Sequence, residues 1–298
     1  MTHVTEKVRG SGGVRHRDFA ITMSVPPPPP LLIFLHLPKT AGSTLARVIE
    51  RQYPAGTVLP LYDSANGEEI RSLSDDRMQR LRVLMGHFYF GAHRFASRPA
   101  MYITVLRDPI ERVISHYYYV RRDPTHYLHG AAQELSLADY VRSCNLAEPN
   151  NDQTRLLCGE YQGAIPETCI DPMLPLAKKN LREHCAVVGL TEDFDRSLLL
   201  IKRRLGWRYP FYERQNVTSA RPRSADLPAD TLRVLQAYNR LDVELYEYAR
   251  ALFQEQVSRE GAWFERQVRA FKRLNVALDT LRSLTRYERT SVRGSRMR

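Results

Sequence analysis

The stretch LLIFLHLPKTAGSTL, residues 31–45, carries the strongest structural signal in the chain. It begins with a short apolar run, which is typical of a fully buried strand. Small and hydroxylic residues follow, and Ser43 or Thr44 can begin the helix that continues through Leu45. A strand, a tight loop and a helix present backbone N–H groups and a positive helix end to an anion. The sequence therefore predicts that Lys39 meets a phosphate or a sulfate.

Strand and helix signals alternate along the rest of the chain. Strands are expected at 31–36, near 57–62 and at 83–87, 101–107 and 185–190, and helices at 43–52, near 75–82, from Pro109, at 139–157 with a break at 148–149, at 192–205 and at 229–256. This alternation predicts βαβ units and a parallel sheet. We expect an α/β, P-loop-like three-layer fold, with a central mostly parallel sheet flanked by helices and a C-terminal helical extension.

Composition divides the chain into three segments. Residues 1–30 are rich in Gly, Ser and charge and end in five prolines, which predicts a disordered, Pro-rich segment. Residues 31–256 are expected to form the α/β domain. Residues 257–298 carry apolar side chains at three- and four-residue steps, which predicts a basic amphipathic helical tail. Its basic face is either simply solvated or serves peripheral membrane contact, dimerisation or binding of an anionic acceptor.

The chain of 298 residues has a net charge of +11, which favours anionic partners. Nucleotides, acidic polysaccharides, nucleic acids and membrane surfaces all fit that charge. The longest apolar runs are far shorter than the roughly 20 residues that cross a bilayer, and the basic N-terminus has no apolar signal region. We therefore expect a cytoplasmic protein. The four cysteines show no metal-ligand spacing, so free thiols are expected.

A second motif, MYITVLRDPIERVISHYYYV, occupies residues 101–120. Its buried strand ends at Arg107, Asp108 can cap the next helix, and Pro109 suits the first helical position. Ligands of open parallel sheets bind outside the carboxyl ends of the strands. Ser115 lies about two helical turns on, close enough to share an anion with Arg107 if the helix folds back along the sheet. A guanidinium group binds phosphate oxygens in a bidentate manner.

The order of residues in the first motif argues against a nucleoside-triphosphate P-loop. That loop is G-x-x-x-x-G-K-[ST], with the lysine after the second glycine and a hydroxyl for magnesium. Here Lys39 precedes Gly42. With the lysine before the glycine, the loop can still bind an anion, but it does not have the arrangement that recognises a triphosphate and magnesium.

Together, PKTAGST and LRDPIERVISHYYY resemble the two donor-binding signatures of sulfotransferases that use 3′-phosphoadenosine 5′-phosphosulfate (PAPS). The resemblance covers roughly residues 31–255. It is closest to the carbohydrate branch that contains the heparan sulfate 2-O- and 6-O-sulfotransferases and their bacterial relatives. It implies that the 3′-phosphate binds to Arg107 and Ser115, and that no metal is needed. It also implies a 5′-phosphosulfate site at Lys39, Thr40, Ala41, Gly42, Ser43 and Thr44, with Lys39 stabilising the leaving oxygen.

The resemblance also implies a histidine base, since histidine commonly accepts a proton near neutral pH. In VLMGHFYFGAH, residues 83–93, His87 matches the position of the Gly-His in the 2-O branch, and His93 is the reserve. The segment PNNDQTRLLCG resembles an acceptor-side segment of the family, with either a structural capping role or substrate contacts. Its candidates are Asn150, Asn151, Gln153 and Arg155, while Thr218 and Arg221 are candidates to close over the nucleotide.

The expected function is therefore O-sulfotransfer from PAPS to a hydroxyl of a carbohydrate or glycolipid acceptor, by in-line displacement with His87 as general base. The resemblance leaves the modified hydroxyl open. A P-loop kinase is one alternative. The other is a protein that binds nucleic acid or another anionic polymer, but the positive charge is concentrated in the tail, and nucleic acid is not expected as a partner.

Overall fold

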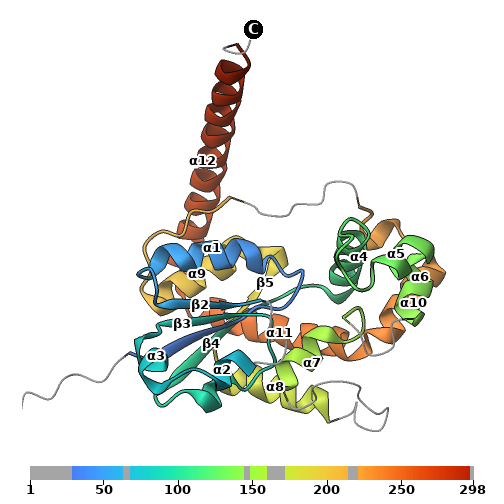
Figure 1. The fold of residues 1–298 in the computed structure, drawn as a ribbon, viewed down its shortest axis with the longest axis horizontal. Helices are drawn as coiled ribbons and strands as arrows, with labels where there is room; N and C mark the ends of the chain where they lie inside the picture. The colour runs from blue at the N-terminus through green and yellow to red at the C-terminus, as the bar shows by residue number, and fades with distance from the viewer. Residues whose placement is uncertain (1–28, 63–67, 144–147, 160–171, 214–220, 296–298) are drawn as a thin grey trace, which may run out of the picture.

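The middle of the protein is a parallel β-sheet (Figure 1). The computed structural model describes residues 29–62, 68–143, 148–159, 172–213 and 221–295. In this part of the chain the sheet has five strands in the order β2-β3-β1-β4-β5. They are β1 (Leu31–Leu35), β2 (Val58–Leu61), β3 (Val83–Gly86), β4 (Ala100–Leu106) and β5 (Cys185–Leu190). Every pairing is parallel, so the carboxyl ends of all these strands lie at one edge.

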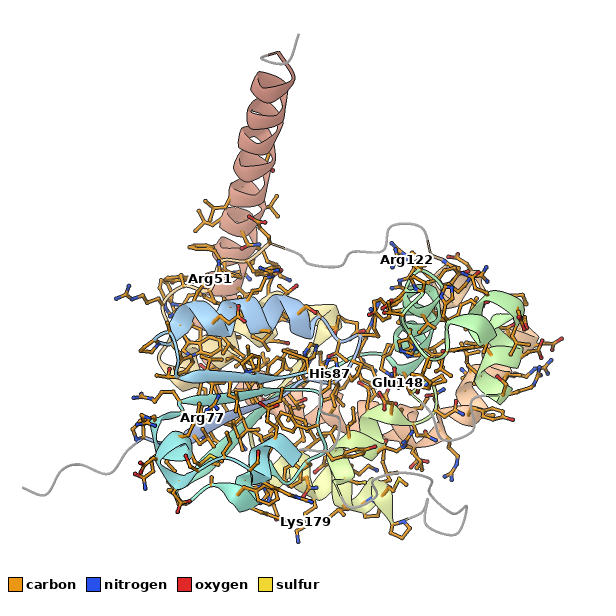
Figure 2. All side chains as sticks on the ribbon, viewed as in Figure 1. Arg51, Arg77, His87, Arg122, Glu148 and Lys179 are labelled. Atoms are coloured by element: carbon orange, nitrogen blue, oxygen red, sulfur yellow. The ribbon has the colours of Figure 1, made fainter. Side chains whose placement is uncertain are left out.

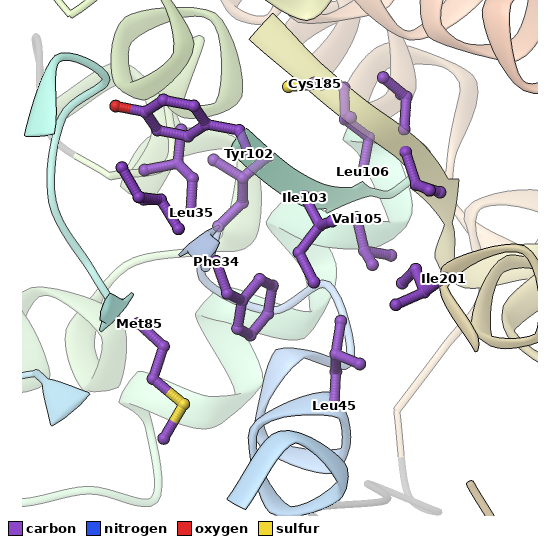
Figure 3. Close-up of a cluster of buried hydrophobic side chains, with 14 of the residues drawn as sticks. Phe34, Leu35, Leu45, Met85, Tyr102, Ile103, Val105, Leu106, Cys185 and Ile201 are labelled. Atoms are coloured by element: carbon purple, nitrogen blue, oxygen red, sulfur yellow. The ribbon is translucent and has the colours of Figure 1, made fainter. Parts of the chain in front are cut away.

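Helices cover both faces of the sheet, which is why β1 is apolar at every position. Figure 1 shows α1 (Gly42–Gln52) and α9 (Phe194–Leu205) along one face, with α3 (Asp75–Arg80) and α8 (Met173–His184) on the other side. In Figure 3, Phe34, Ile103 and Val105 of the sheet lie in one apolar cluster with Leu45 of α1. All four side chains are fully buried. The expected three-layer α/β fold with a parallel sheet is confirmed.

A second apolar cluster lies beside the sheet and forms what we call the helical lobe. The lobe contains α4 (Pro109–Val120), α5 (His129–Glu134), α6 (Leu137–Ser143) and α10 (Ala229–Tyr238) (Figure 1). Its buried side chains are Ile110, Val113, Ile114, Tyr117, Val120, Ala132, Tyr140, Val141 and Leu235. The remaining helices are α2 (Glu68–Arg71), α7 (Asp152–Cys158), α11 (Arg240–Ser258), α12 (Gly261–Ser295) and the 3-10 helices η1 (Ala92–Phe95), η3 (Thr191–Asp193) and η4 (Ser224–Asp226).

Two helical predictions differ from the structure. The helix expected at 229–256 is two helices, α10 and α11, which meet at Asn239. This side chain is fully buried; its amide donates to the Leu235 carbonyl, and its oxygen accepts the backbone N–H of Asn151. Asn239 has φ −117° and ψ 28°, outside the helical range, and its side chain bonds to α10 and to the residue before α7, so one continuous helix is interrupted there. The helix α8 was not predicted from the sequence.

The predicted tail begins inside the core. Phe264, Val268 and Phe271 of α12 are buried in the same apolar cluster as the sheet. The side chain of Asn275 exchanges two hydrogen bonds with the backbone of Tyr212. A domain boundary at residue 257 would therefore cut through packed structure, and only the later part of α12 projects from the body (Figure 1). Residues 1–28 of the expected Pro-rich segment lie outside the described residues.

Among the described helices, none combines the length and the apolar character that a bilayer crossing requires.

Replacing Gly42 with Ala should destabilise the protein. A Cβ at residue 42 would lie 1.8 Å from Cδ2 of His36, whose buried ring would have to shift against the rings of Phe34 and His87. Overpacking of this kind costs about 1–3 kcal/mol of unfolding free energy, measurable by urea denaturation. The matched control is Gly130→Ala in α5, where a Cβ meets no atom within 4 Å and should be neutral or stabilising. Equal stability of the two variants would contradict this account of the Gly42–His36 contact.

Candidate functional site

A cleft with a volume of about 1460 Å³ lies at the carboxyl ends of the strands. It is lined by residues that follow β1, β3, β4 and β5, and by residues of α4, α7 and α12. Chain connections leave β1 toward β2 and leave β4 toward β5, so the direction of winding changes between these adjacent strands. In open α/β sheets this switch point is where ligands bind. The loops that carry Lys39 and Arg107 begin on its two sides.

The loop between β1 and α1 has an unusual backbone. Lys39 and Ala41 have φ angles of 68° and 65°, the left-handed region that L-residues seldom occupy. Such conformations cost on the order of 1–3 kcal/mol each and gather at ligand-binding loops. Alternating left- and right-handed residues turn successive N–H groups toward one side, which forms a nest for an anion. The backbone of this loop is therefore of a kind that binds anions, and the anion site expected from residues 31–45 stays a prediction.

The ammonium group of Lys39 lies over a ring and among other cations. Its Nζ is 3.9 Å from the centre of the Tyr119 ring of α4. Burial, followed by the charges of Arg107, Arg122 and Arg221, lowers the pKa of Lys39 to about 8. An incoming anion would remove part of this repulsion, so the site favours a multiply charged ligand.

Arg107 ties the two sequence motifs together. Its Nη1 donates to the backbone carbonyl of Lys39 at 3.0 Å. The side-chain amide of Gln153 in α7 forms two hydrogen bonds with the backbone of Arg107. Its oxygen accepts the Arg107 N–H and its nitrogen donates to the Arg107 carbonyl, both at 3.0 Å. Ser115, buried in the next helix, lines the same cleft. Lys39, Arg107 and Ser115 thus all line the same cleft, and Arg107 contacts Lys39 directly.

Glu111 joins Arg107 to a segment far along the chain. Its carboxylate is 3.9 Å from Arg107 and 2.8 Å from Arg221, and it accepts the backbone N–H of Ser224. These contacts hold the pKa of Glu111 below its usual value, although burial alone would raise it. Two guanidinium groups therefore face one carboxylate, which leaves a net positive charge for an anion. Thr218, the other late-loop candidate, lies outside the described residues.

Three aromatic rings form another wall of the cleft. His87 follows β3, and its ring lies 4.4 Å from that of His36 and 5.0 Å from that of Tyr62, measured between centroids. Nε2 of His87 is buried and has no hydrogen-bond partner in the described structure. Burial lowers the pKa of His87 to about 4, although the charge of Glu148 opposes the shift. His87 is therefore neutral at pH 7 and able to accept a proton.

Glu148 is the centre of a buried hydrogen-bond network. Nε2 of His116 donates to its carboxylate at 2.6 Å, and Nε2 of His126 lies 3.6 Å from the same oxygen. Nδ1 of His116 faces the Tyr140 hydroxyl at 3.3 Å. Although burial raises the pKa of Glu148, the hydrogen bond and the charges around it lower that pKa to about 2. An anionic carboxylate thus faces the cleft from the lobe side, as Figure 2 shows for Glu148 relative to His87.

The ligand atoms of His116, His126 and Glu148 lie within 4.8 Å of one another, close enough for a metal ion. However, Nδ1 of His126 accepts the backbone N–H of Leu128 at 3.2 Å, so its proton sits on Nε2, the nitrogen that faces Glu148. The protonation pattern fits a hydrogen-bonded network better than a metal centre. The expectation that no metal is used stays a prediction.

Several predicted residues line the cleft and others do not. Those in the cleft are Lys39, Ala41, Gly42, Ser43, Thr44, His87, Arg107, Ser115, Arg155 and Arg221. The Thr40 hydroxyl instead donates to the Leu37 carbonyl. Asn151 precedes α7 without capping it, and its side-chain oxygen accepts the N–H groups of Leu241 and Asp242 at the start of α11. The Gln153 side chain supports Arg107.

His93 is separated from the cleft. Its Nδ1 lies 2.9 Å from the Tyr102 hydroxyl, and its ring stacks on that of His184. The structure therefore does not bring the reserve base to the residues that surround Lys39.

Sequence reasoning missed several cleft residues because each comes from a distant part of the chain. They are Tyr62, His126, Glu148, Tyr212, Lys272 and Asn275. The aromatic run at 116–119 predicts core and groove wall, which fits His116 and Tyr119 as lining residues, but the contact of His116 with Glu148 is not visible in the sequence. The proline after Glu148 was a usable signal, since it predicts a helix break where a side chain can turn inward.

The chain resembles known sulfotransferases in sequence. The family model for galactose-3-O-sulfotransferases matches residues 167–293. Heparan-sulfate 6-O-sulfotransferase 2 of Danio rerio is 33% identical over 185 residues, which is 53% of this chain and 39% of that protein. Heparan-sulfate 6-O-sulfotransferase 1 of Homo sapiens is 32% identical over 187 residues, 53% of this chain and 44% of that protein. The matches thus span less than half the length of these curated relatives.

Solved sulfotransferase structures are also similar. Mouse sulfotransferase SULT7A1 complexed with PAP matches with a TM-score of 0.36 and 15% identity, over 70% of this chain and 63% of that one. A sulfotransferase from Alicyclobacillus acidocaldarius matches with a TM-score of 0.43 and 16% identity, over 76% of this chain and 96% of that one.

Stability should fall as the pH is lowered from about 6.5 to 4. Burial lowers the pKa of His87 and of His36, so the unfolded chain binds more protons than the folded one in this window. We expect His87→Gln to flatten the slope of unfolding free energy against pH by up to about 1.4 kcal/mol per pH unit. Urea denaturation at several pH values measures this slope, and identical slopes for wild type and variant would refute the buried, neutral His87.

Proposed function

The matches support a carbohydrate sulfotransferase family for this chain, and from that premise we propose that it is a PAPS-dependent O-sulfotransferase. The observation that carries the proposal is the 3.0 Å hydrogen bond from Arg107 to the Lys39 carbonyl. It joins the two anion-binding motifs at one end of a single cleft. A donor with a 3′-phosphate and a 5′-phosphosulfate needs two such motifs at a fixed separation.

The proposed donor site divides the nucleotide between the two motifs. The left-handed loop, the N-terminus of α1 and Lys39 would hold the 5′-phosphosulfate. Arg107, Ser115 and Arg221 would hold the 3′-phosphate, with Glu111 keeping both guanidinium groups in position. The buried and mutually repelling cations would gain most from a ligand with several negative charges.

The proposed reaction is an in-line displacement at sulfur. The acceptor oxygen forms a bond to sulfur as the bond from sulfur to the bridging oxygen breaks, and the electron pair leaves with that oxygen. Lys39 stabilises the charge that develops there. His87 takes the proton of the acceptor hydroxyl. Although its pKa is about 4 in the free protein, the negative charge of a bound donor would raise it toward the range of a useful base.

A P-loop kinase is the weaker candidate. Such an enzyme needs carboxylates that are free to hold magnesium. The carboxylates that follow β5 line the cleft but are engaged. Glu192 accepts from Asp108 N–H and the Tyr246 hydroxyl, Asp193 pairs with Arg196, and Asp195 accepts from the Tyr212 hydroxyl. Together with the inverted order of Lys39 and Gly42, these contacts favour a metal-free donor.

The acceptor and the location of the protein belong to the same proposal. The curated relatives are named for heparan sulfate. For this chain we propose only the class of acceptor, a carbohydrate hydroxyl on a polysaccharide or glycolipid. A cytoplasmic location, and membrane contact or dimerisation through the projecting part of α12, remain proposals that need separate tests.

Arg107→Ala should weaken donor binding selectively. Loss of a buried guanidinium–phosphate contact should raise the Kd for 3′,5′-adenosine bisphosphate at least tenfold in calorimetry without metal. Binding of 5′-AMP, which lacks the 3′-phosphate, should change little. The matched control is Arg77→Ala on exposed α3, far from the cleft in Figure 2, with an unchanged Kd expected. Preference of the wild type for ATP with magnesium would instead favour the kinase.

His87→Ala should abolish most transfer while sparing the donor site. Removal of a general base reduces turnover by about 10²–10⁴-fold. Sulfate transfer to a heparan-type oligosaccharide measures turnover, and calorimetry should give an unchanged Kd for 3′,5′-adenosine bisphosphate. His93→Ala tests the reserve base in the same assay. If that variant loses turnover while His87→Ala keeps it, the base has been assigned to the wrong histidine.

A further inference from the structure

Glu148 is a negative charge that the proposed donor site does not use. Its side chain is 34% exposed and lines the same cleft as Lys39 and His87. Figure 2 shows it beside the helical lobe, with His87 at the neighbouring end of the sheet. Although burial alone would raise its pKa, a hydrogen bond and the charges around it hold that pKa at about 2. The carboxylate is therefore ionised at pH 7 and is a candidate for a role in the chemistry of the cleft.

One oxygen of this carboxylate is anchored, and the other has no partner in the described structure. Nε2 of His116 and Nε2 of His126 both face Oε2 of Glu148, at 2.6 Å and 3.6 Å. Among the described residues, no hydrogen bond is made to Oε1. The buried His116 is fixed in turn by the Tyr140 hydroxyl, which lies 3.3 Å from its Nδ1. The network therefore holds the carboxylate in place without using both of its oxygens.

The histidines that anchor Glu148 do not cancel its charge. Burial lowers the pKa of His116, so this ring is neutral at pH 7, donates from Nε2 and accepts the tyrosine hydroxyl at Nδ1. Nδ1 of His126 accepts a backbone N–H, so that ring is neutral as well. Arg112 donates to the backbone carbonyl of Glu148, while its guanidinium pairs with Asp152. The network around Glu148 thus keeps a net negative charge.

The groups closest to His87 give it no negative charge. The rings of His36, which follows β1, and Tyr62, which follows β2, contact the ring of His87. Burial keeps both neutral, because it lowers the pKa of His36 and raises that of Tyr62. The charge of Lys39 adds to burial in lowering the pKa of His87, whereas the charge of Glu148 opposes this lowering. A proton taken up by His87 is therefore disfavoured by Lys39 and favoured by Glu148.

We propose that Glu148 is the counter-charge of the base and stabilises the imidazolium that forms on His87 when the acceptor hydroxyl gives up its proton. The proton passes from the acceptor oxygen to His87, and the electron pair of the broken O–H bond stays on the oxygen that attacks sulfur. Glu148 takes no proton and acts through His87, so it is a positioning residue. Its fixed negative charge makes the buried imidazole a stronger base. The inference rests on the proposed function, because that function assigns the base to His87.

The test measures the protonation of His87 directly. Its ring resonances, assigned with His87→Gln, are titrated by NMR in wild type and in Glu148→Gln, both free and with bound 3′,5′-adenosine bisphosphate. The glutamine keeps the shape of the side chain and can still accept from His116, but it carries no charge. We expect the pKa of His87 to be lower in the variant by about 0.5 or more in both states.

The matched control is Glu134→Gln. Glu134 is an exposed carboxylate on α5 of the same lobe and does not line the cleft. Its replacement removes the same charge and should leave the pKa of His87 unchanged. Glu148→Asp, which keeps the charge but draws it back from the cleft, should lower the pKa of His87 less than Glu148→Gln does.

Turnover gives a second readout. Sulfate transfer from PAPS to a heparan-type oligosaccharide should rise with pH as His87 loses its proton, and Glu148→Gln should move this rise to lower pH. The maximal rate should fall about two- to tenfold, because a weaker base takes the proton less readily. A purely structural role of Glu148 would lower the rate without moving the pH of the rise.

Thermal unfolding checks that each variant is folded, and if Glu148→Gln is not, the titration of Glu148→Asp decides. The inference is overturned if the pKa of His87 is the same in wild type and in the folded Glu148 variant, or if Glu134→Gln lowers it equally. Wild type that does not bind the bisphosphate, or His87→Ala that keeps its turnover, contradicts the proposed function instead. The titration of the free protein still shows in that case whether Glu148 acts on His87.

Discussion

The hydrogen bond between the Arg107 guanidinium and the Lys39 carbonyl is the contact on which the cleft depends. It exists because β1 and β4 are adjacent and parallel, so that the residues after both strands arrive at one edge. The left-handed conformation of Lys39 is sterically unfavourable, and a bond to its carbonyl helps to hold it. Gln153 in turn holds the backbone of Arg107 from α7. The pairing of β1 with β4, the left-handed conformation of Lys39 and the position of the Arg107 guanidinium therefore depend on one another.

Electrostatic repulsion inside the cleft is a consequence of this arrangement. Burial and three neighbouring guanidinium groups lower the pKa of Lys39 to about 8, and Glu111 balances only part of the charge of Arg107 and Arg221. The folded chain therefore keeps cations closer together than their own interactions favour. Such an arrangement is stable only because the surrounding packing fixes it, and it stores binding energy for an anion.

Local patterns in the sequence predict the strands and the anion-binding loop well, because a buried strand, a small-residue turn and a capped helix each depend on neighbours in the chain. The clasp of Gln153 on Arg107 and the network around Glu148 could not be predicted, because they join residues that lie far apart in sequence. For the same reason the break at Asn239 was missed. The amphipathic pattern of α12 was recognised, yet pattern alone does not say that its first turns pack into the sheet's core.

The lining of the cleft also comes partly from local sequence motifs and partly from residues that lie far apart in the chain. The part of the cleft around Lys39 and Arg107 comes from two short motifs, so its chemistry can be inferred from a few adjacent residues. Other parts of the lining come from α7, from Glu148 and from α12, and their charge depends on which carboxylates already pair with arginines. Asp152 and Asp242, for example, lie 3.3 Å and 3.9 Å from the buried guanidinium of Arg112, and these long-range contacts leave no local pattern in the sequence. Under the proposed function, selection of the acceptor would therefore follow from long-range packing, while recognition of the donor follows from local sequence.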